Sequence, residues 1–254
     1  MGTEASLKQL AIQDVRHFYK RYFVPANAVI VIVGALSSDQ AHQLSEHLFE
    51  NRSAGQPAPA IPTAMPLTHA LQKHRPYPAS QTTLFMGQLG ITHHDPHYFP
   101  LIVGNYILGG GSLVSRLAEA LREKRGLTYH VSSELMPMPG RGPFLISLAT
   151  QHQQAKVAEQ LAQQLLTTFI KTGPSEQELA AAKRYLIGSF PLSLASNTDI
   201  ASLLLRIAFY KLPLDFLDHY AHHIQTVTAS DIQHAFQQLI TPERLLIVSV
   251  GPDA

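Results

Sequence analysis

A proline-rich stretch at residues 51–66 divides the chain into two unequal parts. It holds Pro57, Pro59, Pro62 and Pro66 among alanine, serine and glycine, a composition typical of an extended linker. About 50 of the 254 residues precede it and about 190 follow it. The pattern therefore predicts three parts: residues 1–50, a linker at 51–66, and a domain at 67–254.

The first 50 residues hold too few elements for an independent domain. The hydrophobic periodicity predicts an amphipathic helix over residues 6–23 and a buried strand over 28–33 that ends at Gly34. Ser37 or Ser38 can cap a second helix. A single strand has no neighbour to pair with. We therefore expect this part either to be the tail of a domain whose front is absent or to dock on the second part.

The second part contains strands and helices that are grouped rather than strictly alternating. This grouping favours an α+β fold with a mainly antiparallel sheet backed by helices. Gly126 fits the left-handed stop of the helix that Ser112 is expected to cap. Strands are expected at 67–73, 82–91, 127–136, 144–150 and 245–250, and helices after Pro96, after Ser112, and near 153–171, 175–190, 198–210 and 214–240, the last broken near 226–228.

The two ends of the chain resemble each other. Near each end, an aspartate-bearing helix leads through a proline, Pro25 or Pro242, to an apolar strand that ends in glycine. Such an echo indicates two related domains, the first represented only by its last elements.

Composition excludes several classes of function. The formal net charge of +1 provides no field to attract nucleic acid or a membrane surface, so we expect neither as a partner. The chain has no cysteine, which excludes disulfides, thiolate zinc sites and a cysteine nucleophile. No apolar run approaches the roughly 18 residues that span a bilayer. Because cysteine-free proteins occur in both compartments, the sequence leaves cytoplasm and periplasm open, with periplasm slightly favoured.

Three groups of histidines are candidate metal ligands. His42 and His47 resemble a zinc helix, but they are five residues apart, and two histidines that share an ion from one helix need a spacing of four. His219 and His223 have that spacing and lie near Asp215, Asp218 and His222, so a histidine-based metal enzyme stays an alternative. His93, His94 and His97 surround the start of a helix, where a solvated surface is the simpler interpretation.

A glycine-rich loop, Gly109-Gly110-Gly111-Ser112, opens a helix and could present amides to an anion. The lysine of a phosphate-binding loop is missing and no long strand directly precedes it. We therefore expect a flexible loop at which two helices change direction.

One segment brings chemistry-bearing residues together. Residues 115–129 form a helix, a glycine stop and a strand, with Arg122 in the last helical turn and Tyr129 near the start of the strand. A turn of this kind can bring both side chains to one edge. Arginine offers a fork of donors to carbonyls or a carboxylate. A tyrosine hydroxyl can support an oxyanion while its ring packs on a substrate.

This segment and several others, in the same order, resemble the pitrilysin/insulinase family of zinc metallopeptidases, which includes the mitochondrial processing peptidases. The resemblance runs from about residue 6 to residue 254. It is carried by Phe18-Tyr19, residues 22–28, Val33-Gly34, Gly110-Gly111-Ser112, Ser115-Arg116-Leu117, residues 121–129, Gly140, Gly142, Phe144, Glu178-Leu179, Ala182-Lys183, Leu186, Gly188, Val227-Thr228 and Asp231-Ile232.

The resemblance implies an α+β domain of the processing-peptidase type, two or four of which form a clamshell around a chamber. In the family, a first domain carries an HxxEH motif that binds zinc, and a second, zinc-less domain supplies an arginine and a tyrosine, seven residues apart, that hold the peptide. Arg122 and Tyr129 have that spacing. They are the substrate-binding residues that the resemblance implies.

The HxxEH motif is absent from these 254 residues. The resemblance therefore implies no catalytic residue, no metal ligand and no cofactor in this chain, with zinc supplied in the complete enzyme by an HxxEH-bearing domain or subunit. That partner, a peptide substrate and a dimer or heterodimer are expected. The chain would be inactive alone, and the sequence does not separate a fragment of a longer protein from an intact zinc-less subunit. A non-enzymatic scaffold or assembly subunit of the same fold is the alternative.

Overall fold

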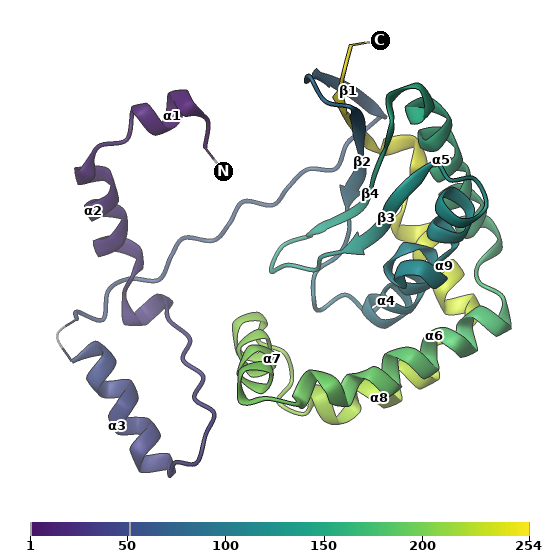
Figure 1. Cartoon of the computed structure of the whole chain (residues 1–254). Helices are drawn as coiled ribbons and strands as arrows, with labels where there is room; N and C mark the ends of the chain where they lie inside the picture. The colour runs from purple at the N-terminus through teal and green to yellow at the C-terminus, as the bar shows by residue number, and fades with distance from the viewer. Residues whose placement is uncertain (1, 51, 254) are drawn as a thin grey trace. The chain divides into compact units, whose positions relative to one another are not determined.

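The computed structural model describes residues 2–50 and 52–253 (Figure 1). They form two compact units. One unit contains the residues up to Pro62 together with Ser193–Lys211, and the other contains Thr63–Leu192 and the residues from Leu212 onward. The predicted boundaries at residues 50 and 66 stay a prediction.

The larger unit is built on one five-stranded sheet in the order β1-β5-β2-β4-β3. Only β1 and β5 run parallel; the other neighbours are antiparallel, which confirms the predicted fold class. The bounds of the strands are β1 Leu71–Pro76, β2 Gln81–Leu89, β3 Thr128–Leu135, β4 Pro143–Gln151 and β5 Leu246–Gly251.

Helices of this unit cover one face of the sheet and leave the other face open (Figure 1). On β2, Leu84 and Met86 are buried, while Phe85 between them is 38% exposed. This alternation gives the sheet one face in the core and one toward solvent. The helices of the unit are α4 Tyr98–Asn105, α5 Ala155–Thr172, α6 Glu176–Ser189, α8 Phe216–Thr226 and α9 Ala229–Leu239, with shorter helical turns at Tyr106–Gly110, Ser112–Val114, Ala118–Glu123, His152–Gln154 and Pro242–Arg244. The turn Phe190–Leu194 spans the boundary between the two units.

Most predicted elements of the larger unit are present, with two differences. The first strand begins at Leu71 rather than residue 67, because its length follows β5, from Leu71 opposite Leu246 to Pro76 opposite Gly251. Ser112 does not cap the following helix. Ser115 does so instead, since its side-chain oxygen accepts a hydrogen bond from Ala118 N at 3.3 Å.

The smaller unit contains α1 Glu4–Lys8, α2 Ile12–Tyr22, the 3₁₀ turn Pro25–Asn27, α3 Ser38–Phe49 and α7 Asn197–Tyr210. The single helix predicted over residues 6–23 is interrupted, because Asp14 accepts a hydrogen bond from Ala11 N at 2.9 Å and starts α2 afresh. Residues 52–66 contain no helix or strand, and Asn51 lies outside the described residues.

The predicted buried strand at residues 28–33 is wrong for this chain. The segment is extended but is not part of a sheet, and Val29, Ile30 and Ile32 are 42%, 38% and 37% exposed. β-Branched residues form a strand only beside a partner strand. Within the described residues no strand pairs with this segment.

No single helix in the described part of the chain has the length and hydropathy needed to cross a membrane. The segment Glu176–Leu194 reaches that length and composition only when it is counted together with α7, across a break.

Candidate functional site

Arg122 and Tyr129 lie side by side, as the sequence predicted. The guanidinium carbon of Arg122 is 5.0 Å from the centroid of the Tyr129 ring. The tyrosine is 82% exposed, and the arginine side chain is 32% exposed. The pair therefore presents a ring and a fork of N–H donors to solvent at the start of β3.

The helix that carries Arg122 ends in a wide turn. Residues 118–123 are π-helical, with Lys124 N donating to Glu119 O at 2.9 Å. Gly126, in the left-handed region with φ +59°, then reverses the chain. Gly126 N donates to Arg122 O at 2.9 Å and Leu127 N donates to Leu121 O at 2.8 Å, which satisfies two carbonyls at the helix end. π-Turns inside helices are often found at functional sites.

A β-bulge directs Tyr129 outward. The pairing of β3 with β4 shifts between Thr128 and Val131, and both residues within the bulge, Tyr129 and His130, are exposed. The Thr128 hydroxyl lies at the bulge within hydrogen-bond distance of two carbonyl oxygens, His130 O at 2.7 Å and Ala149 O at 2.6 Å, which share its single donor. A bulge of this kind aims a side chain away from the alternation of the strand.

The Arg122 guanidinium makes only a weak, solvent-exposed ion pair. Arg122 Nε lies 3.3 Å from the carboxylate of its neighbour Glu123, which is 55% exposed. Lys124 pairs with Glu119 at 2.7 Å. Exposed pairs contribute little, so an incoming carbonyl or carboxylate can displace Glu123 at small cost.

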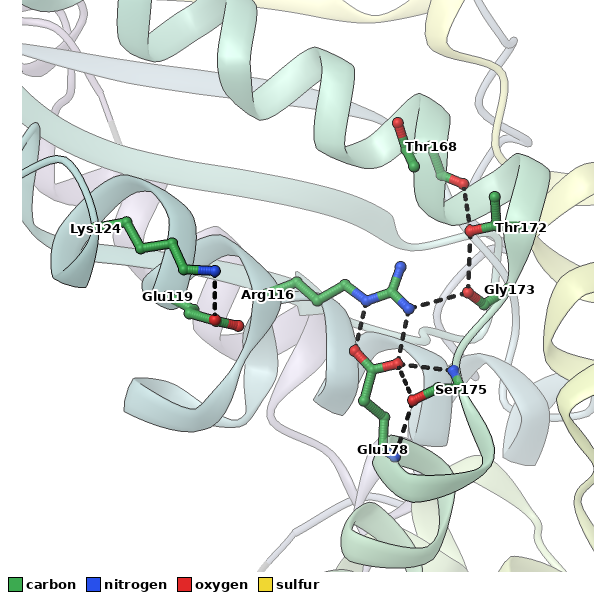
Figure 2. A network of polar contacts seen from close by, with 8 residues as sticks. All are labelled: Arg116, Glu119, Lys124, Thr168, Thr172, Gly173, Ser175 and Glu178. Carbon is green, nitrogen blue, oxygen red and sulfur yellow. Dashed lines mark hydrogen bonds and ion pairs between the residues drawn. The ribbon is translucent and has the colours of Figure 1, made fainter.

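A second cluster holds the other end of the same helical segment (Figure 2). Arg116 binds both oxygens of Glu178, from Nε at 2.6 Å and from an Nη at 2.7 Å, and also donates to Gly173 O at 3.1 Å. Its guanidinium lies 5.0 Å from the centre of the Phe169 ring. The bidentate pair ties the helix that bears Arg122 to the start of α6.

Glu178 is also part of a capping box at the start of α6. Its carboxylate accepts from Ser175 N at 2.7 Å and Ser175 Oγ at 2.8 Å, while Ser175 Oγ accepts from Glu178 N at 3.3 Å. The Arg116 hydrogen bonds, with those from Ser175, lower the pKa of Glu178 from its ordinary 4.5 to about 2, against an opposing contribution from burial. Glu178 therefore stays ionised throughout the neutral range.

Sequence reasoning did not predict the Arg116–Glu178 pair. The spacing Ser175-x-x-Glu178 signals the capping box, but the partner lies 62 residues earlier in the chain. No local pattern connects two such residues.

The histidine groups do not form a metal centre. In the described part of the chain no three histidine, aspartate or glutamate side chains converge to hold an ion. The rings of His219 and His223 are 6.3 Å apart; His219 lies 3.3 Å from Asp215, and His223 stacks on Phe99 at 4.6 Å. Their side chains are therefore not arranged as zinc ligands.

The glycine-rich loop is explained by packing. A side chain at Gly109 would come within 2.5 Å of Ser133 N on β3, so this position needs glycine for close contact with the strand. Asn105, at the end of α4, donates to Ser133 O at 3.1 Å and holds the same contact. The loop is a turn packed against β3.

Comparison with known protein families decides the affiliation of the chain. The family model described as the peptidase M16 inactive domain matches residues 9–186. This chain belongs to the peptidase M16 family. Within that family it corresponds to the inactive, C-terminal domain of zinc-protease-like proteins, which confirms the resemblance to the pitrilysin/insulinase group.

Relatives of this M16 domain include curated proteins and a crystal structure. It is 28% identical over 199 residues to an uncharacterized zinc protease, YmxG, of Bacillus subtilis, covering 78% of this chain and 48% of that protein. It is 25% identical to a non-peptidase homolog, also YmxG, of Helicobacter pylori, covering 91% and 54%. It superposes on the crystal structure of a peptidase M16 inactive domain from Pseudomonas fluorescens with a TM-score of 0.93 and 35% identity, covering 100% of this chain and 60% of that one. The chain thus spans about half the length of the curated relatives it matches.

Proposed function

We propose that this M16 chain is the substrate-binding, non-catalytic part of a clamshell zinc metallopeptidase that cleaves peptides. The contact between Arg122 and Tyr129 carries the proposal, because it offers a peptide both hydrogen-bond donors and an aromatic surface at an exposed strand start. Zinc and the water-activating glutamate would come from an HxxEH-bearing domain or from a partner subunit. The description of relatives as zinc proteases supports a zinc site in the complete protein, outside this substrate-binding part.

Each member of the pair has a defined task in the proposal. The Arg122 fork binds a backbone carbonyl or carboxylate of the peptide, and the charge makes these hydrogen bonds stronger than neutral ones. The Tyr129 ring packs on the peptide, and its hydroxyl donates toward the oxygen on which negative charge develops. Neither residue cleaves a bond.

A structural repeat supports the proposal that residues 1–50 are the end of a first domain of the same fold. Adding 217 to each residue number maps α2 onto α9, the turn Pro25–Asn27 onto Pro242–Arg244, and residues 29–34 onto β5. Both helices begin with the same device, in which Asp14 accepts from Ala11 N at 2.9 Å and Asp231 from Thr228 N at 2.8 Å. Three consecutive elements thus share one register.

The two halves of the repeat differ in burial: α9 and β5 are packed in the larger unit, whereas α2 and residues 29–34 are largely exposed. In α9, Ile232 and Phe236 are 0% and 1% exposed, whereas their counterparts Val15 and Tyr19 in α2 are 54% and 45% exposed. The strand counterpart of residues 29–34 is β5, which has a parallel neighbour on one side and an antiparallel neighbour on the other. We infer that a zinc-bearing domain supplies such strands to residues 29–34 and covers α2.

The proposal is tested by adding an HxxEH-bearing M16 domain or subunit to this chain and measuring cleavage of a fluorogenic peptide. Arg122→Ala and Tyr129→Phe are each expected to reduce turnover by about tenfold or more, since each removes a charge-assisted or oxyanion-directed hydrogen bond. Arg125→Ala, at an exposed arginine on the same turn, is the matched control. Unchanged turnover in both variants would contradict the assigned roles.

A second candidate is a non-enzymatic scaffold or assembly subunit of the same fold. The observation that favours it is the similarity to the Helicobacter pylori protein described as a non-peptidase homolog. This function predicts a stable complex with an M16 partner and no peptide cleavage in any combination. Co-purification without activity would favour it over peptide binding.

A further inference from the structure

The open face of the sheet in the larger unit contains an apolar groove that the proposed function does not use. It has a volume of about 490 Å³, within the roughly 300–1,000 Å³ range of ligand pockets. Its floor is made by alternate residues of the three central strands, which point away from the helices. They are Phe85 and Gly87 on β2, Leu145 on β4, and Leu246 and Val248 on β5.

The floor is deepened at its centre by a glycine. A side chain on Gly87 would approach Leu145 Cδ1 and Phe144 O to 3.1 Å, so it would be tightly packed and would fill the depression. Gly87 pairs with Leu145 on one side and with Leu246 on the other. The depression therefore lies between two leucines.

One end of the groove is cationic. Arg141 donates from Nε to Gly90 O at 2.8 Å and from an Nη to Leu89 O at 3.3 Å, which places it beside the end of β2. Arg244 also lines the groove; it ends the turn Pro242–Arg244, directly before β5, whose first residue Leu246 pairs with Gly87. Both arginines thus line the groove, Arg141 from the segment before β4 and Arg244 from the turn before β5.

The charge at this end is uncompensated. No carboxylate lines the groove, and for residues 2–50 and 52–253 the structure records no ion pair for Arg141 or Arg244. Glu134, opposite Leu145 on β3, lines a neighbouring hollow instead. The polar side chain at this end, Gln88, is engaged with Leu239 O at 2.7 Å and Thr241 N at 2.8 Å.

We propose that this groove binds the carboxyl-terminal end of an apolar peptide, with its free carboxylate between Arg141 and Arg244. Guanidinium groups recognise carboxylates through paired N–H donors. A carboxylate at this end of the groove would meet two guanidinium groups, while the apolar residues before it would lie on the floor. From Phe85 to Leu89 the strand spans about 13 Å, the length of about four extended residues.

The groove is distinct from the Arg122–Tyr129 site. On β4 the groove lies at Pro143–Leu145, whereas Thr128, the neighbour of Tyr129, pairs with Thr150. The inference extends the proposed peptide-binding role, but binding to the groove requires no zinc-bearing partner. Its failure would leave the turnover test of Arg122 and Tyr129 unaffected.

The test measures fluorescence anisotropy of a labelled hexapeptide, ending in leucine, valine and phenylalanine, with the full chain. The free acid is expected to bind about tenfold or more tightly than the same peptide with a carboxyl-terminal amide. Arg244→Gln is expected to abolish that preference. Arg184→Gln, at an exposed arginine on α6, is the matched control and is expected to retain it. Phe85→Ala is expected to weaken both peptides, because it removes part of the apolar floor.

Three results would overturn the proposal. Equal affinity for acid and amide, or a preference that survives Arg244→Gln, would remove the role of the arginines. An amidated peptide with an internal glutamate that binds as tightly as the free acid would show an acidic side chain, not a chain end, as the ligand. Displacement of the peptide by laurate at concentrations below the peptide's own Kd would indicate a fatty-acid site.

Discussion

Arg122 lies over the ring of Tyr129 at 5.0 Å, although the two residues belong to different elements separated by a left-handed glycine. A cation–π contact at an exposed position is worth only about 0.5–1 kcal/mol. The contact therefore orients the two side chains without contributing much to the stability of the fold.

This weak coupling gives the first prediction. Arg122→Ala is expected to lower the free energy of unfolding by less than about 1 kcal/mol, and Tyr129→Phe by less still, since the ring is kept. Urea denaturation followed by circular dichroism measures both. A loss several times larger would mean that the pair is part of the folding core, and turnover losses would then need another explanation.

In contrast to Arg122 and Tyr129, the Arg116–Glu178 pair is expected to contribute substantially to the stability of the fold. Glu178→Gln is expected to lower the free energy of unfolding by about 1–3 kcal/mol at pH 7, because it weakens hydrogen bonds to a charged group. The pKa of Glu178 is lowered from 4.5 to about 2, so its carboxylate stabilises the fold above pH 4.5. That contribution is lost as the pH falls from 4.5 toward 2.

Urea titrations of the wild type and Glu178→Gln across this interval check the pH dependence. The difference between the two proteins should shrink as the pH falls. Glu176→Gln, at an exposed glutamate in the same first turn, serves as control and should change little at any pH. A difference that stays constant down to pH 2 would contradict the assignment.

Gly126 and Gly140 allow the cost of backbone strain to be measured without a contribution from steric crowding. Gly126 has φ +59° and no atom within 4 Å of where a side chain would lie, so Gly126→Ala should cost about 1–2 kcal/mol through backbone strain alone. Gly140 has equally open surroundings without the positive φ, and Gly140→Ala should be nearly neutral. Thermal unfolding of both variants measures the contrast, and equal effects would refute the strain argument.

The structural repeat relates Ile30 to Ile247, so the same substitution can be compared at both positions. Ile247→Asp in β5 should destabilise the larger unit by more than about 3 kcal/mol, because it places a charge in a position that is 5% exposed. At its counterpart, Ile30→Asp should leave stability within about 0.5 kcal/mol. Light scattering should also report less aggregation, since a charge blocks pairing of an exposed strand. Ile30→Asp should nevertheless prevent assembly with a zinc-bearing partner, and assembly at wild-type affinity would refute the inferred role of residues 29–34.

The fold of the larger unit was predictable because most of its helices and strands are indicated by local sequence patterns. Helical periodicity located α5, α6 and α9, and apolar runs bounded by glycine or proline located β4 and β5. The absence of a strand at residues 28–33 was not predictable, since formation of a strand depends on a neighbouring strand as well as on its own residues. For the same reason β1 began four residues later than expected, at the point where β5 begins.

The candidate site was predictable only in part. The seven-residue spacing of Arg122 and Tyr129 brought them to one edge as expected, but the β-bulge that directs Tyr129 outward leaves no trace in the sequence. The pair Arg116–Glu178 and the groove lined by Arg141 and Arg244 both form through long-range strand and helix packing. Such contacts require the tertiary structure.

The position of β5 has a consequence for biosynthesis. It lies between β1 and β2, and among residues 2–50 and 52–253 no other strand pairs with β1. While the ribosome is still adding residues 77–245, β1 therefore has nothing to pair with, and β2 has an open edge that can capture foreign strands. The sheet can close only once residues 246–251 are available, so we expect this domain to fold late, through strand pairing between residues that are distant in the sequence.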